Sequence, residues 1–293
     1  MQSIDRAMGI SETIEIQAPA KINLGLRVLR KRSDGFHDIA TVFLAIEWYD
    51  RLSISASDSI SMTCSDPAIP TDNRNLSVAA AEMMAEKFRV GDGVAIHLEK
   101  HLPSGAGLGG GSSDAASTLL ALRTLWQLSS PIGELNELAL NLGSDVPFFL
   151  DPRPALGQGR GDHLVYLTDT TQTQQLSFPY TVAVAVPPIH SSTATAYKNV
   201  FPQEADPYEL RDLIVNGSVE AWRSNLVNDF ESPIFALYPE ISELKNRFYE
   251  AGAVYASMTG TGSAVYGLFE DEPRAIQAVD DCLFPSWVGR PLV

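Results

Sequence analysis

The glycine-rich segment 103–113, with the sequence PSGAGLGGGSS, is the stretch whose composition most clearly indicates chemistry. Glycines have no Cβ, so their backbone N–H groups can close around an oxyanion. Alternating apolar residues predict a strand over 94–102, and helical spacing predicts a helix over 115–128 with a Ser-Ser-Asp start at 112–114. Because the N-terminus of a helix adds free N–H groups and a positive dipole end, this order predicts a phosphate-binding loop.

Two common phosphate motifs do not fit this loop. Gly105, Gly107 and Gly110 satisfy the letters G-x-G-x-x-G, but the chain continues as a helix and not as the second strand of a dinucleotide fold. A Walker A loop needs Gly-Lys-Ser/Thr, and no lysine follows Gly111. A glycine turn without a ligand would lose backbone entropy with no return in packing. We therefore predict a phosphate cradle of another type.

Other residue types that could bind or react lie far from this loop. Lys21 and Asn23 share one face of a predicted strand, although the pattern alone favours a solvated edge lysine. Phe36 and His37 could stack on and hydrogen-bond a flat base, or form a half-buried pair. Asp145 lies on a Gly-Ser-Asp-Val-Pro turn backed by Phe-Phe, where it could be a catalytic base or a helix cap.

Regular elements must bring these stretches together. We predict strands over 13–17, 22–28, 39–46, 51–62, 94–102, 181–186, 254–258 and 264–269. We predict helices over 78–88, 115–128, 134–142, 207–217, 219–230, 239–249 and 270–283. The Thr-Gly-Thr-Gly-Ser turn at 259–263 is either a tight hairpin or a place where another loop or a phosphate approaches closely. A polar stretch at 169–177 predicts a boundary between domains 1–168 and 169–293.

Composition limits the kinds of molecule this chain can bind and the cellular compartment it suits. The 293 residues carry a formal net charge of −15, which argues against nucleic acid and anionic membranes as partners. Cys64 and Cys282 match neither a disulfide framework nor a metal-site spacing, which indicates a reducing cytoplasm. We find neither an export signal nor an apolar run long enough to span a membrane.

Three ordered motifs together resemble the GHMP kinases, the superfamily of galactokinase, homoserine kinase, mevalonate kinase and phosphomevalonate kinase. These motifs are PAKINL at 19–24, the loop at 103–113, and MTGTGS at 258–263. A more specific resemblance is to the family of kinases that act on 4-diphosphocytidyl-2-C-methyl-D-erythritol in non-mevalonate isoprenoid synthesis. It is carried by AKINLGL at 20–26, RSDGFH at 32–37, GGGSSDAA at 109–116 and LGSDVP at 142–147.

The resemblance implies a fold and an activity. The expected fold is α+β with two domains, in which the N-terminal half is similar to domain 2 of ribosomal protein S5 and the C-terminal half is a ferredoxin-like α/β sandwich. The site would lie in the cleft between them. The implied reaction is ATP-dependent phosphorylation of the substrate's 2-hydroxyl with Mg²⁺. The metal ligands stay open, with Ser112 or Ser113 as candidates. We expect a cytoplasmic monomer or weak homodimer.

The resemblance also assigns site residues. Lys21 and Asp145 match the catalytic pair, and Asn23, Phe36, His37 and Tyr197 match the acceptor site. The family more often has Tyr-His at the cytosine, so Phe36 would keep the stacking but lose a phenol hydrogen bond. The nucleotide would be bound by Asn75, Leu76, Lys100, Pro103, Ser104, Gly105, Ala106, Gly107, Leu108, Gly109, Gly110, Gly111, Ser112 and Ser113. Another kinase of the superfamily, or a nucleotide-binding regulator without turnover, are the alternatives.

Overall fold

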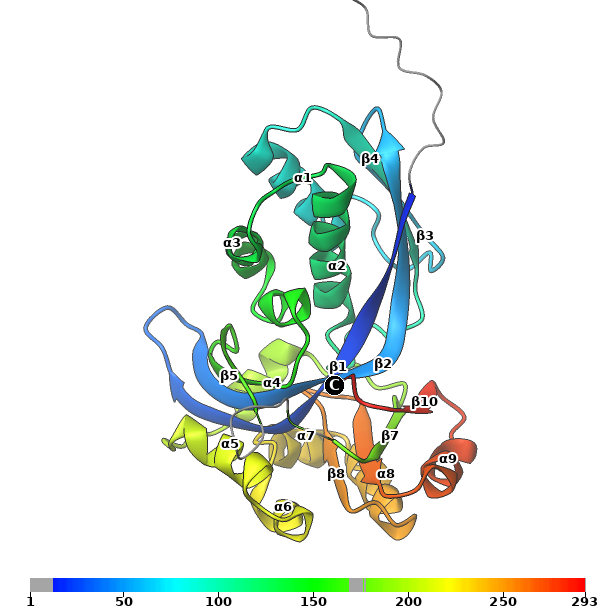
Figure 1. The fold of residues 1–293 in the computed structure, drawn as a ribbon. Helices are drawn as coiled ribbons and strands as arrows, with labels where there is room; N and C mark the ends of the chain where they lie inside the picture. Colours follow the sequence, from blue (N-terminus) through cyan, green and yellow to red (C-terminus); the bar gives the residue numbers. More distant parts are fainter. Residues whose placement is uncertain (1–12, 169–175, 177, 293) are drawn as a thin grey trace, which may run out of the picture.

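The computed structural model describes residues 13–168, 176 and 178–292, which form two sheets with their helices (Figure 1). The strands are β1 (Thr13–Lys31), β2 (His37–Ser57), β3 (Ser61–Cys64), β4 (Gly93–Glu99), β5 (Ala155–Gly159), β6 (His163–Tyr166), β7 (Thr181–Ala185), β8 (Tyr255–Met258), β9 (Val265–Phe269) and β10 (Ser286–Gly289). The helices are α1 (Leu76–Phe88), α2 (Gly110–Leu125), α3 (Ile132–Leu142), the short 3-10 helix η1 (Val146–Leu150), α4 (Thr193–Asn199), α5 (Pro207–Val215), α6 (Val219–Asn225), α7 (Glu231–Leu237), α8 (Pro239–Glu250) and α9 (Glu272–Asp280).

The N-terminal sheet is built on two long antiparallel strands, β1 and β2. Its order is β3-β4-β2-β5-β6, with β1 also paired to β2. The prediction of two short strands in place of each long one is wrong. A bulge accommodates Pro19, where the pairing shifts from Pro19–Tyr49 to Ala20–Ile46, so the strands continue through it. Both therefore extend from the helices α1 to α3 down to the C-terminal half (Figure 1).

Helix α2 begins inside the glycine-rich loop, earlier than predicted. Its N-cap is Gly109, which has a left-handed φ of 73°, and Gly110 is the first helical residue. The Ser-Ser-Asp stretch at 112–114 therefore lies within the first turn and does not cap the helix. Glycine can adopt this φ without steric cost, so the loop turns directly into the helix.

The C-terminal sheet has the strand order β10-β7-β9-β8, and every pairing in it is antiparallel. Taken in chain order, this is the 4-1-3-2 arrangement of a ferredoxin-like βαββαβ unit, which confirms the predicted fold class. The predicted helix over 219–230 is wrong at its end, since α6 stops at Asn225. No strand is predicted at the positions of β5, β6 and β10.

A continuous apolar core joins the two halves. One cluster includes Ile22 and Leu24 of β1, Leu108 of the glycine loop, and Val184 and Tyr266 of the C-terminal sheet. Near its end the chain also returns to the N-terminal sheet, where Leu292 N–H donates to Ala45 O at 2.8 Å. The expected domain boundary adjoins residues 169–175, which lie outside the described residues, so the boundary stays a prediction.

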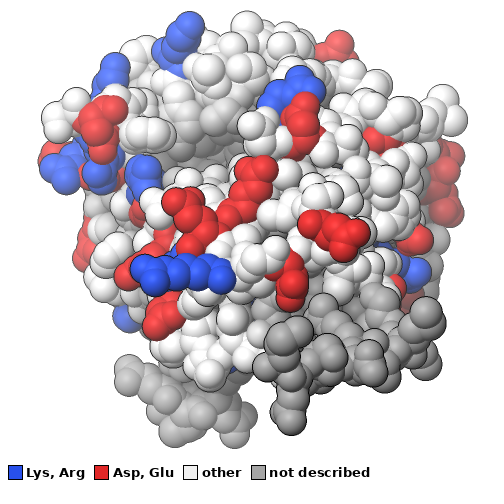
Figure 2. Space-filling model, turned by 90° about the horizontal axis from the view of Figure 1, so that it is seen from above, with Lys and Arg blue, Asp and Glu red and all other residues white. Residues whose placement is uncertain are grey.

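Charged side chains are mixed on the face seen in Figure 2. Asp and Glu gather near its centre, and Lys and Arg lie singly or in small groups among them. The described part of this face thus has no broad basic area of the kind that binds a phosphate backbone. Among the described helices, none combines the length and the apolar character needed to cross a membrane.

Candidate active site

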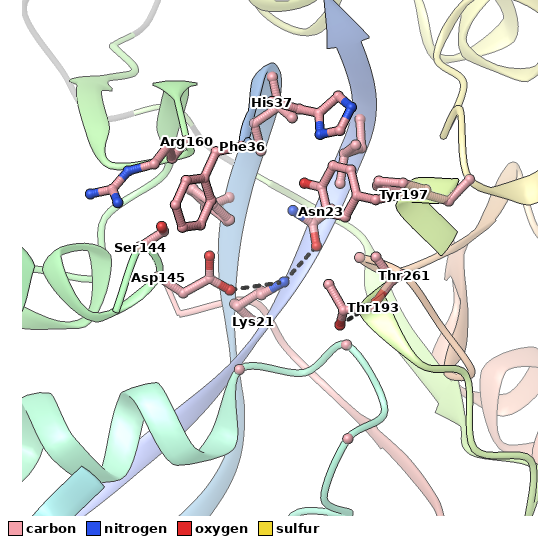
Figure 3. Close-up of a pocket in the computed structure, with 18 of the residues that line it drawn as sticks. Lys21, Asn23, Phe36, His37, Ser144, Asp145, Arg160, Thr193, Tyr197 and Thr261 are labelled. Atoms are coloured by element: carbon pink, nitrogen blue, oxygen red, sulfur yellow. Dashed lines mark hydrogen bonds and ion pairs between the residues drawn. The ribbon is translucent and has the colours of Figure 1, made fainter. Parts of the chain in front are cut away.

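A cavity of about 470 Å³ lies where β1, the glycine loop and the C-terminal half meet (Figure 3). Its walls come from segments that are far apart in the sequence. The predicted catalytic and acceptor residues all line it, namely Lys21, Asn23, Phe36, His37, Asp145 and Tyr197. The structure therefore places these predicted site residues around one space.

Lys21 and Asp145 face each other across the base of the cavity, with 3.6 Å between the amino nitrogen and a carboxylate oxygen (Figure 3). Lys21 is only 3% exposed, so the solvated edge lysine that the pattern favoured is not what the structure shows. Its strand is buried on both faces, because helix α2 and the C-terminal half cover it. Burial lowers the pKa of Lys21, and the charge of Asp145 opposes this shift.

Asp145 directly precedes η1 but makes no side-chain capping hydrogen bond, so the capping interpretation is wrong. Helix α3 ends at Leu142 and Gly143 reverses the chain, after which Asp145 points into the cavity (Figure 3). Its side chain is 35% exposed, and substrate can therefore reach the carboxylate. A carboxylate beside a buried ammonium group is suited to accept a proton from a bound hydroxyl.

Asn23 connects Lys21 to the C-terminal half. Its side-chain oxygen accepts from Lys21 Nζ at 2.6 Å, and the Thr259 hydroxyl lies 3.0 Å from the same oxygen. Its amide nitrogen donates to Thr41 Oγ1 at 2.9 Å. Since Asn23 is 1% exposed and fully engaged, it orients Lys21 and offers little to a substrate.

The glycine loop separates this cavity from a second one of about 360 Å³. Gly105, Gly107 and Gly109 line both cavities. The backbone N–H of Lys21 donates to Leu108 O at 2.9 Å, which ties the loop to the catalytic strand. The two cavities therefore adjoin at these glycines.

The 259–263 turn packs directly on the glycine loop, as one of the two interpretations of its sequence predicted. A Cβ built on Gly107, whose φ is +85°, would lie 2.2 Å from Thr259 O. Ala264 N–H donates to Ala106 O at 3.1 Å. The contact has no room for a side chain, which explains the small residues on both sides.

The predicted adenine-pocket residues line the second cavity, but two of them are engaged elsewhere. Asn75 caps α1, accepting from Ser77 N–H at 2.9 Å, and its amide donates to Pro70 O. Lys100 forms ion pairs with Asp50 and Asp114, and its side chain is only 6% exposed. The Lys100 ammonium is therefore already neutralised by protein carboxylates.

Aromatic rings form the outer wall of the first cavity. Phe36 is 54% exposed, which leaves its ring available to a ligand. His37 stacks on Tyr197 with 4.8 Å between ring centres and an interplanar angle of 25°. Burial lowers the pKa of His37, and burial together with the charge of Asp145 raises the pKa of Tyr197 to about 12. Both side chains are therefore neutral near pH 7.

Arg160 and Ser144 are polar residues of the cavity that the sequence did not single out. Arg160, on the turn between β5 and β6, lies over the Phe36 ring at 5.3 Å from its centre and forms an ion pair with Asp162. The glycines on either side of Arg160 indicate a turn but no role in binding. Ser144, beside Asp145, also lines the cavity. Thr193, at the start of α4, and Thr261, in the 259–263 turn, also line the cavity, and their hydroxyls are 3.2 Å apart.

Comparisons with known proteins agree with this geometry. Residues 75–151 match the family model described as GHMP kinases N terminal domain, and residues 210–283 match GHMP kinases C terminal. A solved structure titled 4-(cytidine 5'-diphospho)-2C-methyl-D-erythritol kinase aligns with a TM-score of 0.77 at 34% identity, covering 94% of this chain and 98% of that one. A homoserine kinase from Cytophaga hutchinsonii, at 17% identity, shares the fold with a TM-score of 0.75.

Relatives with higher identity carry one consistent name. The 4-diphosphocytidyl-2-C-methyl-D-erythritol kinase of Salinibacter ruber is 43% identical over 263 residues, which is 89% of this chain and 92% of the relative. That of Chlorobium limicola is 41% identical over 271 residues, covering 91% and 92%. The chain therefore belongs to the 4-diphosphocytidyl-2-C-methyl-D-erythritol kinase family of the GHMP kinases.

Proposed function

We propose that this enzyme transfers the γ-phosphoryl group of ATP to the 2-hydroxyl of 4-diphosphocytidyl-2-C-methyl-D-erythritol. The observation that carries the proposal is the Lys21–Asp145 pair, which lies at the base of a cavity whose outer wall is aromatic and whose inner wall is the glycine loop. The cytosine would stack on Phe36 and hydrogen-bond to His37. Tyr197 would close the same site as the second ring.

In this mechanism Asp145 accepts the proton of the acceptor hydroxyl while that oxygen bonds to the γ-phosphorus. The bond from the γ-phosphorus to the bridging oxygen breaks, and ADP leaves. Lys21 holds the hydroxyl in place and favours the ionised carboxylate. Backbone N–H groups of the 103–113 loop stabilise the charge on the transferred group, which is most of what phosphoryl transfer requires.

A nucleotide-bound Mg²⁺ fits the residues at the start of α2. Such an ion commonly keeps phosphate and water ligands and needs only one or two protein oxygens. Ser112 lines the second cavity and would hold the ion, whereas the Ser113 hydroxyl is fully buried and lines neither cavity, although it has no hydrogen-bond partner among the described residues. The ion would neutralise phosphate charge. Elsewhere in the described chain, no group of three or more His, Cys, Asp or Glu residues is placed to hold a metal.

The test measures ADP release by the purified protein with ATP, Mg²⁺ and one acceptor at a time. We expect turnover with 4-diphosphocytidyl-2-C-methyl-D-erythritol and none above background with homoserine or mevalonate. Asp145→Asn should lower kcat by about 10²–10⁴, because general-base catalysis supplies about that factor, while the Kd for ATP stays within about twofold. NMR of the product should place the new phosphate on the 2-hydroxyl.

The alternatives give different results in the same assay. A response to homoserine or mevalonate instead would assign the enzyme to another branch of the superfamily. ATP binding without turnover on any acceptor would make it a regulator. A fully active Asp145→Asn variant would move the base to another residue.

A further inference from the structure

A buried ion cluster lies beneath the glycine loop and touches both of its ends. Its members are Asp50 at the bulged part of β2, Lys100 just after β4, and Asp114 in the first turns of α2. Their side chains are 0%, 6% and 4% exposed. The kinase mechanism uses none of these three charges.

Asp50 binds the chain where it enters the loop. One carboxylate oxygen accepts from the backbone N–H groups of His101 at 2.6 Å and Leu102 at 2.8 Å, immediately before the glycine-rich segment. The other oxygen pairs with the Lys100 ammonium. Hydrogen bonds to a charged group are stronger than neutral ones, so this entrance is held firmly.

Lys100 connects the entrance to the exit. Its ammonium also donates to Asp114 Oδ2 at 2.9 Å, inside the helix that follows the loop. A Cβ built on Gly110 would lie 3.0 Å from the Lys100 amino nitrogen and 3.4 Å from an Asp50 oxygen. The cluster therefore packs against the residue where the loop becomes helix.

We propose that Asp50, Lys100 and Asp114 form a clamp that sets the span of the glycine loop, and that Asp50 is thereby a positioning residue for the nucleotide triphosphate. This proposal rests on the proposed function, from which it takes the identity of the bound nucleotide, ATP. The loop's own glycines have the greatest backbone freedom, so an ordered cradle needs its ends fixed by something else. Asp50 supplies this from outside the second cavity, whereas Lys100 and Asp114 also line that cavity.

The test compares ATP affinity in Asp50→Asn, Asp114→Asn and the unmodified enzyme by calorimetry. Asp50→Asn keeps an oxygen for the backbone N–H groups but removes the charge, and we expect the Kd for ATP to rise by about tenfold. Asp114→Asn keeps an acceptor for Lys100 and should raise the Kd for ATP by about threefold. In steady state the KM for ATP should rise while the KM for the acceptor stays within about twofold.

A matched control has the same chemistry away from the loop. Asp38, at the start of β2, is a largely buried carboxylate that pairs with Arg30 and Arg32, and its side chain is 13% exposed. Asp38→Asn removes one charge, as Asp50→Asn does, and should not change the Kd for ATP. Lys100→Arg keeps the charge and should retain most of the ATP affinity.

Two outcomes separate the clamp from the proposed function. If folded Asp50→Asn and Asp114→Asn bind ATP as tightly as the unmodified enzyme, the clamp is wrong. If Asp50→Asn does not fold, the Kd for ATP of folded Asp114→Asn tests the clamp instead. Amide hydrogen exchange over 103–112 needs no nucleotide or acceptor and should be faster in both variants. Exchange at the unmodified rate would overturn the clamp, while absent turnover in the unmodified enzyme would overturn only the function.

Discussion

At the scale of single residues, burial decides what each charged group of the site can do. Lys21 is held at 2.6 Å from Asn23 Oδ1 and 3.6 Å from Asp145, so its position is set by the protein before any substrate arrives. Lys100, which the resemblance assigned to the nucleotide, is instead neutralised by two carboxylates. The two buried lysines thus have different surroundings, since Lys21 pairs with one carboxylate and Lys100 with two.

The neutral form of His37 gives a pH prediction. Burial, with a smaller effect from Lys31, lowers its pKa below the ordinary 6.5, so the neutral form is favoured in the folded protein and protonation occurs only as pH falls through the lowered pKa. Protonation removes the acceptor nitrogen of the ring. At saturating ATP, the KM for the acceptor should be constant from about pH 8 to 6.5 and rise at least about threefold by about pH 5.

His37→Gln is the control for this pH profile. It keeps an acceptor and a donor but does not titrate in this range. Its KM should be higher than that of the unmodified enzyme at pH 7.5 and should vary less than about twofold down to pH 5. An identical rise in both proteins would assign the pH dependence to another group.

At the scale of elements, the site depends on two turns in direct contact. The glycine loop and the 259–263 turn approach so closely that Gly107 has no space for a side chain. Each turn is recognisable alone from its glycines, but their contact is a property of how β1, α2 and the C-terminal sheet pack. The loop is therefore supported from the C-terminal half as well as from its own strand and helix.

Replacing Gly107 should separate these two turns. In Gly107→Ala the Cβ would lie 2.2 Å from Thr259 O and the residue would keep a φ of +85°, so the loop must shift. We expect the Kd for ATP to rise by more than about tenfold, because a misplaced cradle loses several backbone contacts to phosphate. Calorimetric titration with ATP measures this.

Gly133→Ala is the matched control, because it lies in α3, has no atom within 4 Å of the new Cβ, and has no positive φ. It should bind ATP normally and gain up to about 1 kcal/mol of stability. Equal ATP affinity in the two alanine variants would contradict the tight contact of the two turns.

At the scale of the whole molecule, hydrogen bonds between residues more than 200 positions apart hold the halves together around the cavity. Thr259 Oγ1 accepts from Asn23 N–H at 3.1 Å, and Tyr266 donates its hydroxyl to Asn23 O at 2.8 Å. Both partners are buried in the apolar core shared by the two sheets. The cavity is therefore part of a single packed structure.

Thr259→Val tests this connection with little change in volume. It leaves Asn23 N–H buried without its acceptor, which costs about 1–3 kcal/mol. Unfolding in urea should have a lower midpoint, and kcat should fall because Lys21 loses the support of Asn23. The control Thr63→Val removes a hydroxyl from the exposed strand β3 and should change stability by less than about 0.5 kcal/mol. Equal midpoints for the two variants would show that the Asn23–Thr259 hydrogen bond does not help to hold the halves together.

The local parts of this enzyme follow from residues that are close together in the sequence. The glycine loop, the 259–263 turn and the strand face shared by Lys21 and Asn23 were all predicted correctly, because turn chemistry and side-chain alternation depend on neighbouring residues. The motif order was also sufficient to indicate the kinase family and its α+β fold. Element ends were predicted less well, since α2 begins at a glycine and β1 passes through a proline bulge.

The contacts among these parts depend on tertiary packing and could not be predicted from the sequence. The burial of Lys21, the free carboxylate of Asp145 and the partners of Lys100 all depend on segments distant in the chain. Periodicity describes one strand at a time, so it favoured a solvated lysine where two halves of the molecule in fact cover both faces. The composition of the glycine loop predicts a phosphate cradle, but its span, its wall at Thr259 and its place beside Lys21 and Asp145 are set by long-range packing.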